Sequence, residues 1–571
     1  PDDDLMWGKW NFMHTTDTHG WLGGHQHEKD VYGGATWGDF ANFALLMKKK
    51  ARRLKRDLFL FDSGDTHDGT SLSDTTEPDG TFTNELITRV PYDALTIGNH
   101  ELYQADITKD VYNNFAKHWK GRYLTSNAYI LDAGSGRYIP IGHKYSLFTG
   151  EFGTRVMAFG FIFNFPDFAK PETSVNRVAE ELKRPWFKKA LDDHIMQADH
   201  VDLIAVLAHS SVRSPELQAV HDAIREHIQS KRPNLPIFFF GGHLHIRDFR
   251  RFDSHSYGIA SGKFFETVGW LSATPSHDNS TLDVTRTFID ASPQGFKRYV
   301  DMPTTANLTM ALPVGHTIAR DIAKQQTTMN LNFVYGCAPS NYYFDRYPHT
   351  DPRSLLYLLE KEVLLSVVPK PGRRDNTFVL FNTGSQRYDL FAGPFTRDDE
   401  IVVSPFKTEI QVIENVPLHV VALVQGKLEA GIARRRRRLK RRHATVGSPA
   451  EHPAGTLIVA GNPVCPPGMT YGSVTDDDLT HQGLPRGDNV AHCMMPQYEV
   501  PSYLATPLPE VTAANANDPY DIVFMAFFTD LLNAALNSIT RSTDYTKTVY
   551  PTYRPGFNGQ NFWGEYAKKH W

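Results

Sequence analysis

Short apolar runs alternate with amphipathic segments through the first 300 residues of the chain. The apolar runs have the length and composition of buried strands. Between them, apolar residues recur at helical spacing, first around Phe40–Met47 and again around Val220–Ile228. This alternation predicts helices packed against sheets, which is an α/β arrangement. The six predicted strands are Trp10–His14, Leu58–Asp62, Asp93–Ile97, Val156–Phe163, Val201–Leu207 and Leu235–Phe240.

The pattern changes after residue 300. The segment Asp301–Gln325 is polar and mixed, so we interpret residues 301–329 as a connector between a domain over residues 1–300 and a second domain over residues 330–571. The second region shows a helical pattern at Pro352–Leu365. Its strand patterns are Thr377–Phe381, Glu400–Val403 and Glu409–Ile413.

Two long irregular insertions interrupt the second region. One carries the basic run Arg434–Arg442, which is open to three interpretations: a solvated surface loop, a processing site at the dibasic pairs, or a patch for nucleic acid or lipid headgroups. No aromatic residues interleave with these arginines, which disfavours nucleic-acid binding. The other insertion, Gly447–Pro509, reads as a long loop, and its Cys465 and Cys493 could form a disulfide.

Composition narrows the class of protein. The 571 residues carry a formal net charge of −4, so no global field favours nucleic acid or an anionic membrane. No apolar run reaches the roughly 18 residues that a transmembrane helix needs. Pro1–Asp4 does not have the features of a signal peptide, although it could be what remains after one is removed. Sequons at Asn279 and Asn307 add a weak indication of a secreted or vacuolar protein.

Polar motifs follow five of the apolar runs, each where the strand pattern ends. Ligands of α/β proteins gather at the carboxyl ends of strands, so these motifs are expected to meet. Imidazole, carboxylate and amide oxygen suit zinc, manganese, iron or magnesium. One such motif alone is ordinary turn chemistry, but all five together predict a metal site. The motifs are Asp17-Thr18-His19-Gly20, Gly64-Asp65, Gly98-Asn99-His100-Glu101, Ala208-His209 and Gly241-Gly242-His243-Leu244-His245.

These motifs, in this order, resemble those of the calcineurin-like metallophosphoesterases over roughly Trp10 to Val268. The resemblance implies a four-layer α/β/β/α sandwich that holds two divalent metal ions, Zn²⁺, Mn²⁺ or similar. It implies that His100 is the catalytic histidine. It also implies that Asn127, which fits the family's additional Asn after a strand, contacts substrate. The implied ligands are Asp17, His19, Asp65 and His245 for one ion, and Asp65, Asn99, His209 and His243 for the other, with Asp65 as the bridge.

The second region resembles the C-terminal domain of 5'-nucleotidases. The similarity lies in Asn382–Arg387, Ala392–Thr396 and Ser404–Phe406, and it implies a smaller α+β C-terminal domain that binds substrate. The residues implied to contact substrate are Arg346, Asn382 and Arg387, with Phe406 stacking on the base and Phe527 or Phe528 as a second stacking Phe. Simpler interpretations stay open: core packing for Phe406, a surface charge for Arg387, a buried apolar helix over Tyr520–Leu532, and Arg353 in place of Arg346.

The sequence also departs from the family pattern. The family often has an Asp three residues after the catalytic His, and Tyr103 stands there in this chain. Asp106 is one candidate to replace that Asp, and a different orientation of His100 is the other. The Gly-Gly-Asp expected towards the C-terminus is also missing, although Asp530 lies near Phe527.

The favoured function is therefore hydrolysis of nucleoside 5'-monophosphates by a dinuclear phosphoester hydrolase. The alternatives are a phosphodiesterase for UDP-sugars or cyclic nucleotides and a non-catalytic, nucleotide-binding member of the family. The expected partner is a small-molecule phosphoester, with no nucleic acid, no transmembrane segment and a possible homodimer.

Overall fold

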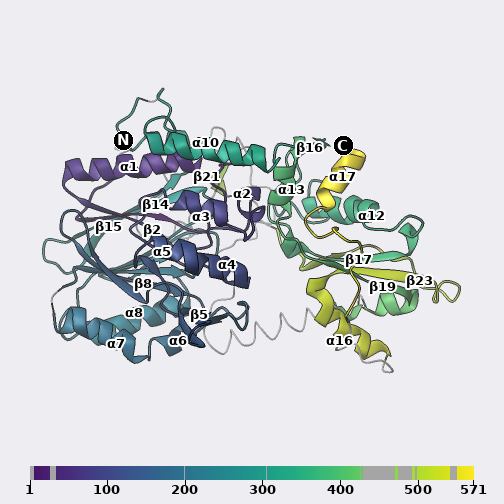
Figure 1. The fold of residues 1–571 in the computed structure, drawn as a ribbon, viewed down its shortest axis with the longest axis horizontal. Helices are drawn as coiled ribbons and strands as arrows, with labels where there is room; N and C mark the ends of the chain where they lie inside the picture. Colours follow the sequence, from purple (N-terminus) through teal and green to yellow (C-terminus); the bar gives the residue numbers. More distant parts are fainter. Residues whose placement is uncertain are drawn as a thin grey trace. The chain divides into compact units, whose positions relative to one another are not determined.

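The chain forms two compact units. The structure is a computed structural model, and it describes residues 5–25, 34–198, 200–303, 305–424, 426–428, 470–472, 492–494, 498–540 and 549–571. The first unit comprises Pro1–Gln326 with Val464–Met494, and the second comprises Thr327–Pro463 with Met495–Trp571. Each unit has its own sheets and helices (Figure 1).

Two six-stranded sheets lie at the centre of the first unit. Their facing sides are lined with aromatic rings, and Phe12 of one sheet packs on Phe238 and Phe240 of the other. In order across the first sheet, the strands are β15 (Leu282–Asp290), β14 (Thr267–Pro275), β1 (Trp10–Thr15), β2 (Asp57–Asp62), β3 (Ala94–Thr96) and β4 (Tyr123–Leu124). In the second they are β12 (Arg247–Asp253), β13 (Ser256–Ser261), β11 (Ile237–Gly241), β10 (Leu203–His209), β8 (Arg155–Ile162) and β7 (Tyr145–Thr149).

Helices cover the two outer faces of this pair of sheets (Figure 1). Helices α1 (Trp37–Leu54) and α10 (Pro313–Thr328) lie on one side, and α9 (Pro293–Lys297) packs on α1 through the stacked rings of Phe296 and Phe43. Helices α6 (Val178–Glu181), α7 (Pro185–Leu191) and α8 (Pro215–Ile228) lie on the other, over a core that they share with β8, β10 and β11. The four-layer α/β/β/α sandwich expected from the sequence is confirmed.

Shorter elements complete the first unit. The helices are α2 (Ser71–Asp74), α3 (Thr81–Ile87), α4 (Ala105–Asp110) and α5 (Ala116–His118). A small sheet contains β6 (Arg137–Pro140), β5 (Ala128–Asp132) and β9 (Thr173–Val175), and a two-stranded sheet contains β20 (Thr470–Gly472) and β21 (His492–Met494).

Helix α10 corrects one expectation from the sequence. We expect residues 301–329 to be a connector from the sequence, but Pro313–Thr328 forms a 16-residue helix, and the first unit extends to Gln326 near its end. Its polar composition is that of a helix with one buried stripe, on which Gly315, Ile318 and Ile322 are buried. The amide of Asn42 on α1 accepts from the Gly315 N–H at 3.0 Å and donates to the Leu308 carbonyl at 2.8 Å, so α1 holds this segment in place.

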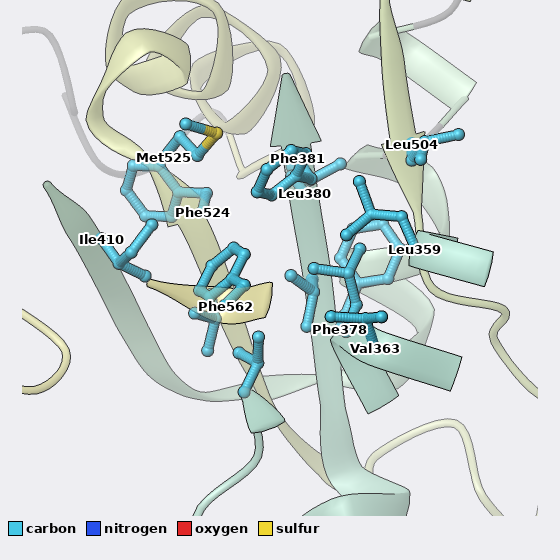
Figure 2. Close-up of a cluster of buried hydrophobic side chains, with 14 of the residues drawn as sticks. Leu359, Val363, Phe378, Leu380, Phe381, Ile410, Leu504, Phe524, Met525 and Phe562 are labelled. Atoms are coloured by element: carbon cyan, nitrogen blue, oxygen red, sulfur yellow. The ribbon is translucent and has the colours of Figure 1, made fainter. Parts of the chain in front are cut away.

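The second unit is built on a four-stranded sheet, and the α+β C-terminal domain is confirmed. In order, its strands are β19 (Ile410–Pro417), β23 (Pro519–Met525), β17 (Thr377–Asn382) and β22 (Tyr503–Ala505), and β16 (Val334–Ala338) pairs separately with β18 (Gly393–Thr396). The helices are α11 (Leu355–Leu358), α12 (Leu364–Val367), α13 (Arg397–Val403), α16 (Thr529–Thr540) and α17 (Phe562–His570). Figure 2 shows the core, in which the ring of Phe381 on β17 lies 5.2 Å from the ring of Phe562 on α17, measured between ring centres.

Three elements of this unit differ from expectation. The predicted strand Glu400–Val403 is part of helix α13, because a capping box between Thr396 and Asp399 starts a helix there. The predicted helix Pro352–Leu365 begins at Leu355. A single π-helical turn, Leu359–Val363, joins α11 to α12. The stretch Tyr520–Leu532 is not one apolar helix, since it contains β23, a single turn and the start of α16.

Candidate metal centre

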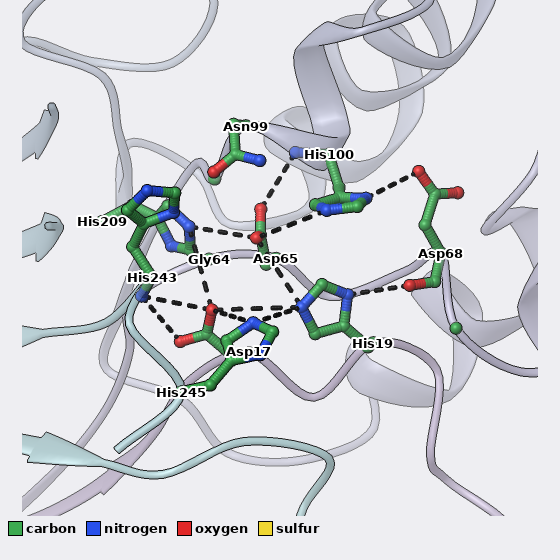
Figure 3. Close-up of polar contacts among 12 residues, drawn as sticks. Asp17, His19, Gly64, Asp65, Asp68, Asn99, His100, His209, His243 and His245 are labelled. Atoms are coloured by element: carbon green, nitrogen blue, oxygen red, sulfur yellow. Dashed lines mark hydrogen bonds and ion pairs between the residues drawn. The ribbon is translucent and has the colours of Figure 1, made fainter. Parts of the chain in front are cut away.

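The sandwich brings the predicted ligands to one edge of its two sheets. Asp17 and His19 follow β1, Asp65 follows β2, and Asn99 follows β3. These three strands are parallel, so their carboxyl ends meet. His209 ends β10, and the loop with His243 and His245 follows β11, which is parallel to β10. The side chains converge around Asp65 (Figure 3).

Two groups of donor atoms lie close enough to bind a cation each. Within each group the atoms are no more than 4.8 Å apart, and Asp65 belongs to both. The first group is Asp17, His19, Asp65 and His245, and the second is Asp65, His209 and His243. Figure 3 shows the Asn99 amide beside Asp65. This grouping is the one that the resemblance implies, with Asp65 as the shared carboxylate.

The backbone is strained at these positions. Five of the seven predicted ligands, Asp17, His19, Asp65, His243 and His245, have φ between 46° and 74°. A non-glycine residue in this region costs about 1–3 kcal/mol and clusters at functional sites. Close packing adds to the constraint, because a Cβ on Gly98 would stand 2.0 Å from Asp65 Oδ1. The loops are therefore shaped around the side chains they present.

Two of the histidines are fixed in the tautomer of a metal ligand. His19 Nδ1 lies 2.8 Å from the Asp68 carbonyl, and His209 Nδ1 lies 2.8 Å from the Ser63 carbonyl. A carbonyl only accepts, so each Nδ1 carries the hydrogen. In both rings Nε2 then faces Asp65 Oδ2, at 3.7 Å for His19 and 3.0 Å for His209. Metal-binding histidines are typically held in this way by their second nitrogen.

The centre attracts positive charge. Burial by itself raises the pKa of Asp65, but the imidazoles of His209 and His100 outweigh it and hold that pKa well below its usual range. Conversely, burial lowers the pKa of His209, and the carboxylates of Asp65 and Asp17 more than reverse this, raising it to about 10. Asp65 is therefore an anion at neutral pH, the state in which a carboxylate can bind a metal ion.

The amide oxygen of Asn99 is a further sign that these residues could bind two metal ions. Asn99 Oδ1 is buried and has no hydrogen-bond partner among the described residues. An unpaired buried amide oxygen costs about 1–3 kcal/mol. Coordination of a metal ion by Asn99 Oδ1 would remove this cost. Asn99 Nδ2 is engaged, since it donates to Tyr103 Oη at 3.2 Å.

His100 lies beside this centre and is held on two sides. Its backbone N–H donates to Asp65 Oδ1 at 2.9 Å, and its Nε2 lies 4.0 Å from Asp65 Oδ2. Its Nδ1 lies 2.9 Å from Asp68 Oδ2 (Figure 3). Asp106, the carboxylate that the sequence offered, is not the one at this nitrogen: Asp106 is exposed, and its Oδ1 accepts from the Ile107 N–H.

Sequence reasoning missed Asp68 and its neighbour His67. Asp68 Oδ1 lies 3.0 Å from His67 Nδ1, and His67 is fully buried. Burial lowers the pKa of His67, but the Asp68 and Glu101 carboxylates overcome this and raise it to about 10. A signal was available, because Asp68 stands three residues after Asp65 in the same loop.

Two other contacts with the centre were also missed. The Glu101 carboxylate accepts from the backbone N–H groups of Asp65, Thr66 and Gly98. The ring of Phe163 stacks on His243 with a centroid distance of 4.1 Å. Glu101 thus contacts the loops that carry Asp65 and Asn99, and Phe163 contacts the His243 ring.

Asn127 has a structural role in the first unit. It is fully buried, its Nδ2 donates to the carbonyls of Ile162 and Asn176, and its Oδ1 accepts from the Ile162 N–H. Both amide hydrogens are thus used within the protein. Because Asn127 is buried and both of its amide hydrogens are used, the expectation that it contacts substrate is corrected.

In the second unit, three of the predicted substrate residues lie near one edge of the sheet. Asn382 ends β17 and Phe527 follows β23, and these strands are parallel. Phe406 precedes β19, whose first residue Ile410 pairs with Met525 at the end of β23. Phe527 is 65% exposed, which rules out core packing for it, and Phe406 is half-buried.

The two predicted arginines differ in their surroundings. Arg387 is exposed, and its guanidinium lies 5.1 Å from the centre of the Phe406 ring. Arg346 forms an ion pair with Asp389 at 2.9 Å and lies over the Tyr343 ring. The competing Arg353 pairs with Asp351, and its side chain is 54% exposed. Asn382 Oδ1 accepts from the Gly384 N–H at 3.0 Å.

Both the region with the metal-ligand motifs and the C-terminal region match known protein families. Residues 11–247 match the calcineurin-like phosphoesterase family, and residues 341–532 match the family described as NAD nucleotidase, C-terminal domain. The crystal structure of a 5'-nucleotidase from Candida albicans is 32% identical and superposes with a TM-score of 0.81, covering 99% of each chain. The chain belongs to the 5'-nucleotidase family of calcineurin-like metallophosphoesterases.

As a member of this family, the protein is a hydrolase that acts on phosphoester bonds. A protein of Arthroderma benhamiae described as a secreted protein is 33% identical, over 100% of this chain and 91% of its own length. The crystal structure of a 5'-nucleotidase precursor from Thermus thermophilus is 16% identical with a TM-score of 0.55, covering 98% and 96% of the two chains, and shows the same fold.

Some predictions for this metallophosphoesterase concern residues beyond those described. The run Arg434–Arg442 and the possible partner Cys465 lie outside the described residues, so their interpretations stay predictions. Asn279 and Asn307 of the sequons are both exposed. Within the described part of the chain, none of the helices has the length and apolar character needed to cross a membrane.

Proposed function

We propose that this protein removes the phosphate from nucleoside 5'-monophosphates at a centre of two divalent ions, Zn²⁺, Mn²⁺ or similar. The observation that carries the proposal is the double donor set around Asp65, in which all seven predicted ligands converge. When bound, such ions neutralise phosphate charge and lower the pKa of a coordinated water. The ligand assignment follows the two donor groups, with Asn99 completing the second.

The protein's own residues have distinct parts in this proposal. The strained loops hold Asp17, His19, Asp65, His243 and His245 in place before substrate arrives, so that little reorganisation is needed. His100 presents Nε2 towards the centre, within reach of a phosphoryl oxygen or of the leaving group. Proton transfer from such a side chain contributes roughly 10²–10⁴-fold to the rate.

The nucleoside preference is proposed from the second unit. Phe406 and the exposed Phe527 offer flat faces for a base, each worth about 1–3 kcal/mol. Arg387 and Arg346 offer planar forks suited to phosphate or ribose oxygens. The similarity to a 5'-nucleotidase at 32% identity supports this preference. A secreted location is proposed on the similarity to the secreted protein of Arthroderma benhamiae.

A second candidate function has one observation in its favour. Residues 341–532 match the NAD nucleotidase C-terminal domain, which supports dinucleotides or other phosphodiesters such as UDP-sugars as substrates. A non-catalytic member is disfavoured, because the full set of ligand side chains is present and assembled.

A substrate panel tests the proposal. Hydrolysis products of the metal-loaded protein are separated by chromatography and quantified for the four nucleoside 5'-monophosphates, NAD, a UDP-sugar and a cyclic nucleotide, with wild type, Asp65→Asn and His100→Asn. We expect nucleoside monophosphates to be the best substrates, with losses of at least about 100-fold in both variants. Near-wild-type turnover by either variant would refute the assignment of the centre, and preference for a diester would favour the second candidate.

A further inference from the structure

We propose that Asp68 is the positioning residue for His100, and that the buried His67 in turn holds Asp68. This inference rests on the proposed role of His100 in phosphoester hydrolysis. In this proposal Asp68 takes the role for which the sequence offered Asp106, and His100 needs no other orientation. The carboxylate comes from the loop after β2 rather than from the segment that follows His100.

The geometry of the Asp68 carboxylate carries the proposal. Its two oxygens face two different imidazoles, with Oδ2 at 2.9 Å from His100 Nδ1 and Oδ1 at 3.0 Å from His67 Nδ1. The side chain is 10% exposed. Ser73 Oγ accepts from the Asp68 N–H at 3.1 Å, and Asp68 itself has a φ of 63°. A buried carboxylate in a strained, hydrogen-bonded turn has little freedom to point elsewhere.

His67 fixes the other side of this carboxylate. The ring is fully buried, and its Nε2 lies 3.6 Å from Glu101 Oε1. His67 therefore stands between two carboxylates, Asp68 and Glu101. Glu101 in turn binds the backbone N–H groups of Asp65 and Gly98, so the chain of contacts ends at the loops that present the metal ligands.

The consequence for His100 concerns which nitrogen faces the reacting groups. Because Asp68 accepts at Nδ1, Nε2 is left to face the centre, where it lies 4.0 Å from Asp65 Oδ2. A carboxylate at one imidazole nitrogen fixes the orientation of the ring. In the reaction, water supplies the oxygen that bonds to phosphorus, the ester P–O bond breaks, and the leaving oxygen takes the Nε2 proton. The proton released by the attacking water restores His100 through solvent.

Neighbouring groups do not replace Asp68 in this role. Tyr103, at the position of the family's usual Asp, stacks edge-on against His100, and its Oη accepts from Asn99. Asp106 is exposed on α4 and bonds to its own helix turn. Asp106 thus provides a matched control, because Asp106→Asn makes the same chemical change without touching His100.

Kinetics on the full chain test the proposal first. Asp68→Asn, Asp106→Asn, His100→Asn and the Asp68→Asn/His100→Asn double variant are compared on a nucleoside monophosphate and on p-nitrophenyl phosphate. We expect Asp68→Asn to lower kcat about 10–100-fold on the nucleotide with little change in KM, and much less on the nitrophenyl ester, whose leaving group needs no proton. In the His100→Asn background, Asp68→Asn should cost nothing further, and Asp106→Asn should match wild type.

A second readout does not depend on activity. In protein labelled with ¹⁵N at histidine, the Nδ1–H signal of His100 is identified by its absence from His100→Asn. That signal should be present in wild type and Asp106→Asn and lost or strongly shifted in Asp68→Asn. If Asp68→Asn does not fold, Asp68→Glu, which keeps the charge but displaces it, takes its place with the same expectations.

The outcomes separate this inference from the proposed function. Equal losses on both substrates, additive losses in the double variant, or an unchanged His100 signal in Asp68→Asn would overturn the role of Asp68. If wild type releases phosphate from none of the substrates, the proposed function fails, while the ¹⁵N signal still decides whether Asp68 positions His100.

Discussion

At the scale of single residues, one buried carboxylate holds two ligand loops together. Glu101 is 1% exposed, and its two oxygens accept four hydrogen bonds, from the N–H groups of Asp65, Thr66 and Gly98 and from the Thr66 hydroxyl. Asp65 and Thr66 lie in the loop after β2, whereas Gly98 lies in the loop after β3. The position of Asp65 therefore depends on a residue that belongs to neither of the two donor groups.

Replacing this carboxylate by an amide should weaken both stability and metal binding. In Glu101→Gln, the amide NH₂ would face backbone donors, leaving buried N–H groups without acceptors. We expect a loss of about 2–3 kcal/mol in the free energy of unfolding and about 10–100-fold weaker metal binding. Urea denaturation and metal titration measure the two effects.

A surface residue provides the control for Glu101. Glu85 forms an exposed ion pair with Arg89, just beyond the end of α3, and Glu85→Gln should stay within about 0.5 kcal/mol of wild type. If Glu101→Gln unfolds at the same urea concentration as wild type, the hydrogen bonds to Glu101 do not stabilise the loops.

The limits of sequence reasoning are clearest at this scale. Asp65, His209 and the paired His243 and His245 could be predicted, because each follows a recognisable strand and has a residue type suited to metals. Asp68 could not be assigned in the same way. Its contact with His100 joins two loops that are 32 residues apart, and the pairing depends on the left-handed turn at Asp68.

At the scale of elements, the close contact of α1 with the start of α10 is set by two glycines. A Cβ on Gly38 would lie 2.5 Å from the Gly315 carbonyl oxygen, and a Cβ on Gly315 would lie 2.3 Å from Asn42 Nδ2. Backbone can approach this closely only where side chains are absent. This contact explains why a polar segment forms a helix within the first unit.

Adding one methyl group at this contact should destabilise the first unit. Gly315→Ala would force the Asn42 amide away from the Gly315 N–H and the Leu308 carbonyl. We expect a loss of about 1–3 kcal/mol, as for other overpacked sites, with a lower melting temperature in calorimetry. The exposed neighbour His316 provides the control, since His316→Ala should change little. Equal stability of Gly315→Ala and wild type would contradict this account of the packing.

Strands were easier to predict than helices for a physical reason. Buried parallel strands such as β10 and β11 are continuous apolar runs, which the sequence displays directly. Helix α13 was predicted as a strand because Ile401–Val403 is apolar and β-branched, whereas its helical state is set by the Thr396–Asp399 capping box. Helix α10 was missed because only one stripe of it is buried.

At the scale of the whole molecule, the two units are assigned different tasks. The first unit holds the metal centre and His100, and the second holds the aromatic and arginine side chains proposed to bind the nucleoside. Phe406 with Arg387 over its ring is the best-defined part of that second site. If this division is correct, damage to the second unit should affect nucleotide affinity and leave the phosphoester chemistry intact.

Truncating Phe406 tests this division. We expect Phe406→Ala to raise KM for a nucleoside monophosphate about 10-fold, within the range for loss of one base stack. Hydrolysis of p-nitrophenyl phosphate, which has no nucleobase, should stay at the wild-type rate. Phe333, an exposed aromatic residue elsewhere in the second unit, gives the control Phe333→Ala, for which no change is expected. A KM unchanged by Phe406→Ala would exclude stacking at this position.

The central claim is that Asp65 and the six side chains around it bind two divalent ions that the phosphoester chemistry requires. Metal analysis and phosphate release on the same sample test it most directly. We predict about two equivalents of divalent metal per chain, loss of metal and activity together on chelation, and recovery of both with Zn²⁺ or Mn²⁺. Asp65→Asn should bind less metal and stay inactive. Full activity after complete removal of metal, or a folded wild-type protein that binds no divalent ion, would contradict the claim.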